Sequence, residues 1–196
     1  MANVTWALVT MDAMNGRELM ISGEWYQDDP KLREQRRRCA RLLERFNTAG
    51  ADEDEERAAV LQELVRSVGH GATVMPRFTC SYGDQISIGR DALVNYDCLL
   101  MDDAAIDIGN GVLIGPRSQL LTARHPVEDH QARRDGWERA EPITLGANAW
   151  LAAGVLVGPG VTIGANAVVG LGSVVVKDVP EGVLMAGNPA KVVRSL

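Results

Sequence analysis

The chain has 196 residues, 46% of them hydrophobic and 23% charged, a composition typical of a folded globular domain rather than a disordered one. Its 26 acidic residues outnumber 20 basic residues, and the formal charge of −6 argues against binding nucleic-acid phosphates as its main activity. No run of about 18 apolar residues occurs, and no positively charged segment precedes the mildly apolar start. We expect a cytoplasmic protein without membrane or nucleic-acid partners.

A helical leader comes first. Asp28-Asp29-Pro30 followed by KLREQRRRCARLLERFN predicts a capped helix with proline in its first turn. Its apolar residues share one face: Leu32, Cys39, Leu42, Leu43 and Phe46. Its arginines are expected to form mainly a solvated face: Arg33, Arg36, Arg37, Arg38, Arg41 and Arg45. A second helix is predicted from about Asp52 to Ser67, with four residues facing inward: Leu61, Leu64, Val65 and Val68.

Aliphatic residues then recur every sixth position, and we call this series the hexad ladder. Its members are Ile88, Val94, Leu100, Ile108, Ile114, Leu120, Leu145, Leu151, Val157, Ile163, Val169 and Val175. Glycine follows many of them. This period fits neither a helix nor a simple alternating strand. It is typical of short strands joined by bends, three hexads to a triangular coil, with the coils stacked as parallel strands.

The hexad ladder has two interruptions. It slips by two residues around Asp102 and Asp103, and it stops at residues 122–141, which are predicted to leave the coil as a long loop. Long loops on rigid scaffolds commonly carry function. The predicted organisation is therefore an N-terminal extension and helical leader over residues 1–70, then a β-solenoid domain over residues 71–196 with a C-terminal tail.

The cysteines and histidines are few. Cys39, Cys80 and Cys98 are far apart and odd in number, which predicts reduced, mostly buried thiols rather than a disulfide framework or a zinc finger. His70, in Gly-His-Gly, is expected at a helix end as a cap or surface group. His125, in Ala-Arg-His-Pro, lies in the predicted loop, from which a base can reach a substrate.

Several ordered blocks carry a resemblance: GEWYQDDP, SYGDQISIGRDALVNYDCLLMDD, IGNGVLIGPRSQLLTARHPV, EPITLGANAW and GNPAKVVR. From about Met14 to Arg194 the chain resembles the hexapeptide-repeat acetyltransferases that act on sugars, in particular the maltose, galactoside and nodulation O-acetyltransferases. The resemblance implies an all-β solenoid, a left-handed parallel β-helix with an N-terminal helical segment. It also implies a homotrimer with active sites between subunits, and acetyl transfer from acetyl-CoA to a sugar hydroxyl. The left hand comes from the resemblance alone, since most parallel crossovers are right-handed.

The resemblance assigns the catalytic roles to two residues. His125 matches the family's catalytic histidine, which deprotonates the acceptor hydroxyl; such general-base help is worth typically about 10²–10⁴-fold. Asn95, in Val-Asn-Tyr-Asp, matches an asparagine that stabilises the transition state or orients the acceptor. The alternative for Asn95 is a corner amide that closes a turn. Cys98 falls at a small inward position and is expected in the core, so we predict direct transfer without a covalent intermediate.

The resemblance also assigns the binding residues. Besides Asn95, the positions for the acceptor are Asp28, Arg36, Ser81, Asp103 and Trp150. The positions for coenzyme A are Ala153, Leu171, Val176, Lys177, Lys191 and Arg194. Carboxylates suit vicinal hydroxyls, and basic residues suit the phosphates of the nucleotide. An N-cap explains Asp28 equally well, and an ordinary outward-facing hydrophobic position explains Trp150 equally well.

The chain departs from the family pattern at Arg124, which precedes the histidine where small residues are usual. If its guanidinium is close, it depresses the pKa of the histidine or binds an anionic acceptor. Further departures are Asp97, Ala152, Val176 and Lys191. Together they indicate that the acceptor need not be maltose or a galactoside.

Three alternatives stay open. The same chemistry can act on an amino sugar or another hydroxylated metabolite. A metal hydratase like the gamma-class carbonic anhydrases uses the His-x4-His spacing that His125 and His130 have, but its third histidine would have to come from two coils earlier, and His70 precedes the hexad ladder. A non-catalytic scaffold is expected to lose His125 or the basic residues of the donor site. We expect no bound metal.

Overall fold

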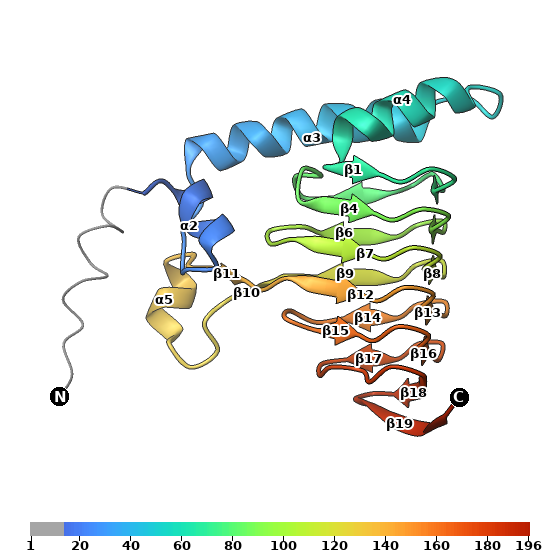
Figure 1. Cartoon of the computed structure of the whole chain (residues 1–196). Helices are drawn as coiled ribbons and strands as arrows, with labels where there is room; N and C mark the ends of the chain where they lie inside the picture. The colour runs from blue at the N-terminus through green and yellow to red at the C-terminus, as the bar shows by residue number, and fades with distance from the viewer. Residues whose placement is uncertain (1–13) are drawn as a thin grey trace.

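The computed structural model describes residues 14–196, and the predicted extension ahead of Met14 lies outside them. The chain forms a stack of β-coils, with helices α3 and α4 lying across one end and the C-terminal hairpin at the other (Figure 1). The predicted all-β solenoid with an N-terminal helical segment is confirmed. No helix among these residues is long and apolar enough to cross a membrane.

The leader folds as α2 (Gly16–Ser22), α3 (Pro30–Thr48) and α4 (Asp54–Leu64). The predicted capped start of α3 is confirmed, with the Asp29 carboxylate accepting a 2.7 Å hydrogen bond from the Leu32 amide. Asp29 and not Asp28 is therefore the cap. The apolar face of α3 is buried through Leu32, Cys39, Leu42 and Phe46.

The second predicted helix ends three residues early. Arg66 donates its backbone N–H to Ile86, and Ser67–Val68 pairs with the next coil as a strand. The backbone groups that would continue the helix are therefore used by the solenoid, which begins at Ser67. His70 follows in the first turn of this coil, so its predicted position at a helix end is wrong.

Each coil visits three parallel sheets in turn. Sheet I contains β1 (Ser67–Val68), β4 (Ile86–Ile88), β7 (Ile106–Ile108), β12 (Ile143–Leu145) and β15 (Thr162–Ile163). Sheet II contains β2 (Thr73–Val74), β5 (Leu93–Val94), β8 (Leu113–Ile114), β13 (Trp150–Leu151), β16 (Val168–Val169) and the C-terminal β18 (Val183–Gly187) and β19 (Ala190–Ser195), which pair antiparallel. Sheet III contains β3 (Thr79–Cys80), β6 (Leu99–Met101), β9 (Gln119–Leu121), β14 (Leu156–Val157) and β17 (Val174–Val175).

The hexad ladder fills the inside of the coils, as predicted. None of its members is more than 4% exposed. Most of the glycines that follow them are required by the close approach of successive coils, and Gly158 is an exception with room for a Cβ. A Cβ on Gly89 would lie 2.6 Å from the backbone nitrogen of Asn110 in the next coil, and one on Gly109 would lie 2.7 Å from the carbonyl oxygen of Leu145.

The first interruption of the ladder is a buried carboxylate. Asp102 is fully buried, and its side chain accepts backbone hydrogen bonds from Ser81 (2.9 Å), Tyr82 (2.8 Å) and Gln85 (3.3 Å) of the preceding coil. At the two-residue slip, successive coils are thus joined by these hydrogen bonds to Asp102, which we call the polar staple. Burial raises the pKa of Asp102 to about 7, against the three backbone donors that favour its charge.

The second interruption is the predicted loop, which leaves the solenoid after β9. It contains β10 (Ala123–Arg124), α5 (His130–Arg134) and β11 (Arg139–Ala140), with β10 and β11 paired antiparallel. Its far end is fastened to the leader, because the backbones of Tyr26 and Glu138 exchange two hydrogen bonds of 2.9 Å. The loop and the leader therefore form one wall beside the coils.

The three cysteines are free and buried, as predicted. Cys98 lies inside the coils. Cys39 of α3 and Cys80 of β3 place their Sγ atoms 3.5 Å apart, where the helix packs on the first coil. The hydrogen bond between the two thiols, followed by burial, raises the pKa of Cys80 well above its ordinary value, so this thiol is held in its neutral form.

Candidate functional site

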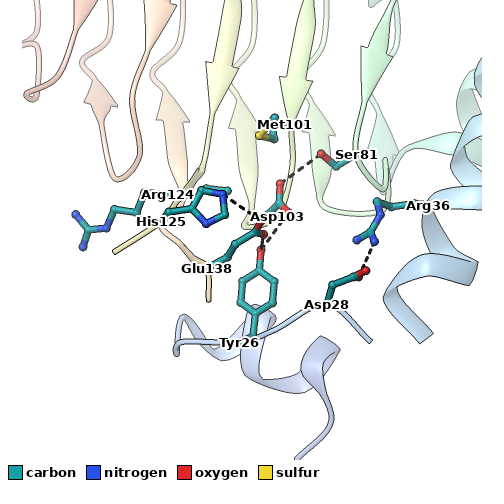
Figure 2. A pocket seen from close by; sticks show the side chains of 10 residues that line it. Tyr26, Asp28, Arg36, Ser81, Met101, Asp103, Arg124, His125 and Glu138 are labelled. Atoms are coloured by element: carbon teal, nitrogen blue, oxygen red, sulfur yellow. Dashed lines mark hydrogen bonds and ion pairs between the residues drawn. The ribbon is translucent and has the colours of Figure 1, made fainter. Parts of the chain in front are cut away.

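A cavity of about 510 Å³ lies between the leader, the loop and the corner where sheet III turns into sheet I (Figure 2). We call it the acceptor cavity. Its lining residues come from these separate parts of the chain: Tyr26, Asp28, Arg36, Ser81, Met101, Asp103, Ala123, Arg124, His125 and Glu138. These ten residues span more than a hundred positions of the sequence. They meet here because a backbone bridge joins the leader to the loop.

His125 stands at the edge of this cavity and is half exposed. Its Nδ1 lies 2.9 Å from the backbone carbonyl oxygen of Trp137. A carbonyl only accepts, so the contact requires the proton on Nδ1 and leaves the lone pair of the neutral ring on Nε2. Nε2 lies 3.5 Å from a carboxylate oxygen of Glu138. The loop therefore fixes both the tautomer and the orientation of the imidazole.

Two carboxylates share one phenol beneath the imidazole. The Tyr26 hydroxyl lies 2.9 Å from Glu138 and 3.2 Å from Asp103, and Figure 2 shows all three side chains converging. Burial, followed by the negative charge of Glu138, raises the pKa of Asp103. Burial, followed by the charge of Asp103, raises the pKa of Tyr26, so the phenol stays a donor. Ser81 completes the set, with its Oγ 3.3 Å from Asp103.

The opposite wall is an arginine held by several partners. Arg36 of α3 reaches Asp28 at 2.5 Å and donates to the Tyr82 hydroxyl at 2.7 Å. Arg17 and Arg36 both lie over the ring of Tyr82, at 5.5 and 5.7 Å. Arg36 is thus the member of the predicted solvated arginine face that turns into the cavity, while Asp28 pairs with it.

The acceptor cavity brings together five of the residues singled out from the sequence: Asp28, Arg36, Ser81, Asp103 and His125. It does not contain Asn95 or Trp150. Asn95 follows β5 and accepts a 2.8 Å hydrogen bond from the Tyr96 amide, at the corner between sheets II and III. Trp150 lies on β13 of sheet II, 49% exposed and in register with Leu113 of β8.

The residues assigned to coenzyme A lie mainly elsewhere on the solenoid. Ala153 and Leu171 line a separate hollow of about 640 Å³ at the corner between sheets II and III, together with Arg77, Tyr96, Asp97, Pro116, Arg117 and Gly154. We call it the corner hollow. Val176 and Lys177 follow β17 and are exposed, and Lys191 and Arg194 are exposed on β19. Asn95 directly precedes Tyr96, which lines the corner hollow, and is not itself one of the lining residues.

Arg124 does not face the imidazole. Its guanidinium lies 2.5 Å from the Glu141 carboxylate, and Figure 2 shows it pointing away from the ring of His125. The ion pair follows from the hairpin β10–β11, which brings the two ends of the loop together. The close approach of Arg124 to the imidazole that the sequence analysis considered is therefore absent from the structure.

Four lining residues were not singled out in the sequence analysis: Tyr26, Met101, Ala123 and Glu138. Tyr26 and Glu138 are paired over 112 positions, and neither belongs to a periodic pattern. Their meeting depends on the bridge between leader and loop. Within residues 14–196, no three His, Cys, Asp or Glu side chains are placed to hold a metal ion.

Comparison with known proteins places these features in a family. Residues 19–69 match the maltose acetyltransferase hexapeptide capping motif. Over 90% of its length the chain is 41% identical to nodulation protein L of Rhizobium meliloti (strain 1021), of which it covers 96%. The chain belongs to the hexapeptide-repeat sugar O-acetyltransferases. The family membership expected from the sequence blocks is confirmed.

Solved structures of the family have the same fold. A maltose O-acetyltransferase from Clostridium difficile 630 is 40% identical and superposes with a TM-score of 0.91, covering 94% of this chain and 98% of that one. A galactoside acetyltransferase in complex with coenzyme A is 39% identical with a TM-score of 0.89, covering 93% and 91%. The helical leader and the loop of this family member therefore belong to the shared architecture.

Proposed function

We propose that this protein transfers an acetyl group from acetyl-CoA to a hydroxyl of a sugar or sugar-like acceptor, directly and with His125 as general base. The observation that carries the proposal is the acceptor cavity, in which an imidazole of fixed tautomer stands beside carboxylates and a serine suited to binding hydroxyls. Family membership supports the transfer of an acetyl group, and the coenzyme A complex of a relative supports the donor.

In this mechanism the acceptor hydroxyl lies against Nε2 of His125. As its oxygen attacks the thioester carbonyl carbon, its proton passes to Nε2, and the Glu138 carboxylate at 3.5 Å stabilises the imidazolium that forms. The carbon–sulfur bond then breaks, and the proton passes from His125 to the sulfur of coenzyme A. Asp28, Arg36, Ser81 and Asp103 hold the acceptor ring.

The donor is proposed to lie along the corner hollow, with Ala153 and Leu171 beside the pantetheine arm, and with Val176, at the corner after sheet III, contacting it from an adjoining copy of the chain. The phosphates would meet Lys177, Lys191 and Arg194, which are exposed on an otherwise acidic chain. Asn95 directly precedes Tyr96 of this hollow. Its side-chain amide would donate a hydrogen bond to the thioester carbonyl oxygen as negative charge develops there. Trp150 lies on β13, just before Ala153, and its indole would form a wall beside the bound donor.

The acceptor cavity and the corner hollow lie at two different corners of the same coils. One copy of the chain therefore cannot bring the donor and the acceptor together. A homotrimer could do so, because in a closed ring the corner between sheets III and I of one copy can contact the corner between sheets II and III of the next. Exposed apolar side chains support such contacts on both sides: Tyr96, Leu113, Trp150 and Leu171 on sheet II or the corner after it, and Val176 at the corner after sheet III. Each active site would then combine His125 of one copy with Asn95 of its neighbour.

The test is thiol release from acetyl-CoA with a panel of sugars, aminoglycosides and glycosylated metabolites. We expect acceptor-dependent release that falls by roughly 10²-fold or more in His125→Ala, because the base is removed. Coenzyme A binding should be unchanged in this variant. His130→Ala, on the same loop, is the matched control and should retain turnover.

Full turnover by His125→Ala would refute the mechanism. Release that does not depend on any acceptor would refute the transferase. If the protein binds coenzyme A without turnover on the whole panel, the donor assignment stands and the acceptor class is wrong. Absence of coenzyme A binding would contradict the donor assignment and favour the non-catalytic scaffold or the metal hydratase instead.

A further inference from the structure

The bridge between leader and loop separates two sets of side chains. Tyr26 and Glu138 oppose each other across it, and both face the acceptor cavity. Side chains alternate along extended backbone, so their neighbours Trp25 and Trp137 lie on the other side of the bridge. The phenol and the carboxylate therefore serve the acceptor cavity, and the two indoles form a separate surface beside it.

Two hollows open on this surface. One, of about 320 Å³, is lined by Trp25, Arg124, His125, Pro126, Val127, Glu128 and Asp129. The other, of about 340 Å³, is lined by Trp25, Pro126, Asp129, Ala132 and Trp137. We call the pair the tryptophan annex. Arg124 and His125 line both the annex and the acceptor cavity, so the imidazole stands on the border between them.

The lining of the annex has the character of a site for a sugar ring. The chain has only four tryptophans, and two of them meet here, partly buried so that part of each indole remains accessible. An indole offers a flat apolar face to the C–H face of a pyranose, and the exposed carboxylate of Glu128 can accept hydrogen bonds from its hydroxyls. Asp129 caps α5 through one carboxylate oxygen, which leaves the other oxygen to accept. Pro126 restricts the backbone between His125 and the rest of the tryptophan annex.

We propose that the tryptophan annex binds the second ring of an oligosaccharide acceptor, while the first ring occupies the acceptor cavity and presents its hydroxyl to His125. The inference rests on the proposed function and narrows its substrate class to acceptors of two or more sugar rings. Contact with the second ring positions the reacting hydroxyl, so binding of this remote part of the substrate contributes to the rate.

The test compares acetyl transfer to matched acceptors of one and two rings: glucose and maltose, galactose and lactose, N-acetylglucosamine and its β-1,4 dimer. We expect kcat/KM to favour the two-ring member of at least one pair by about tenfold, and Trp25→Ala to remove this preference. The one-ring rate should stay within about twofold of the parent, which also shows that the variant folds. Trp25→Phe should retain most of the preference, and Ile21→Ala, at an exposed apolar position on α2, should leave both rates unchanged.

Two results would overturn the annex proposal alone. One is equal kcat/KM for both members of every pair, and the other is an equal loss for one and two rings in Trp25→Ala. Absence of transfer to all six sugars by the parent protein would also overturn the annex proposal, whereas the proposed function is overturned separately, by the absence of acceptor-dependent thiol release on the whole panel. The intrinsic tryptophan fluorescence provides an independent readout: the favoured disaccharide should change it, and the effect should be lost in Trp25→Ala.

Discussion

At the residue scale, the site depends on which groups are allowed to change charge. The Trp137 carbonyl fixes the proton of His125 on Nδ1, and this contact uses backbone, so it is independent of the side chain at position 137. The proposed proton acceptor, Nε2, faces Glu138, which is itself held by the Tyr26 hydroxyl. Tyr26 cannot take up the role of an acid, because burial raises its pKa. The arrangement therefore supports one proton transfer, at His125.

Glu138→Gln tests the electrostatic part of this arrangement. The amide oxygen can still accept from Tyr26, but the negative charge beside the imidazolium is lost, so we expect kcat to fall roughly tenfold, or about 1.4 kcal/mol in barrier height. Coenzyme A affinity, measured by calorimetry, should not change. Asp135→Asn, at an exposed carboxylate of the same loop, should leave kcat intact. A parental kcat in Glu138→Gln would contradict the role of its charge.

At the element scale, successive coils are joined by the aliphatic ladder and, at one point, by a polar staple. Asp102 accepts from three backbone groups of the preceding coil and orders the turn that carries Ser81. Its neighbour Asp103 faces the acceptor cavity. The interruption of the ladder therefore positions two of the residues proposed to bind the acceptor, at the corner that the loop and the leader cover.

Asp102 also makes stability depend on pH. Burial raises its pKa to about 7 from an ordinary value of 3.8, so the folded chain holds this proton more tightly than the unfolded chain does. Its contribution to the free energy of unfolding is complete below the unfolded pKa and is lost as the pH rises through the folded one. We expect the Tm of the parent relative to Asp102→Asn to fall between about pH 5 and pH 8. Thermal unfolding of both proteins across this range checks it, and a constant difference would refute it.

At the scale of the whole molecule, the solenoid separates the two proposed ligand sites. The acceptor cavity uses the corner after sheet III, and the corner hollow uses the corner after sheet II (Figure 1). The coils are rigid because their interior is filled by buried aliphatic side chains. Bending one coil cannot bring the corners together, which is why assembly of several copies is the simplest way to complete the site.

Trp150→Asp tests the assembly. Trp150 is 49% exposed on sheet II, so the change should leave the coil folded while placing a charge in the proposed contact between copies. We expect light scattering to show a trimer for the parent and a monomer for the variant, with acetyl transfer lost. Ile21→Asp, at an exposed apolar position on α2, should remain trimeric. A parent that is monomeric and active would refute the shared site.

The solenoid was predictable from the sequence because its determinant is local and repeated. Each ladder residue and each following glycine meets the same requirement, an inward aliphatic side chain and a close approach of coils, so the period of six exposes both. His125 was likewise found from its own motif, and Asp28, Arg36, Ser81 and Asp103 from the resemblance. The hand of the coil came from the resemblance too, since the period does not depend on it.

Only the tertiary structure decided how these residues meet. Tyr26 and Glu138 have no periodic partner, and their contact arises from a single backbone bridge between segments 112 positions apart. The same bridge sends Trp25 and Trp137 to the opposite side and creates the annex. The structure also shows that Asp29 caps α3, which leaves Asp28 to pair with Arg36. The sequence determined the repeating interior, where one rule applies at every coil. Pairings that occur once leave no repeated pattern in the sequence, and they become visible only when the chain is folded.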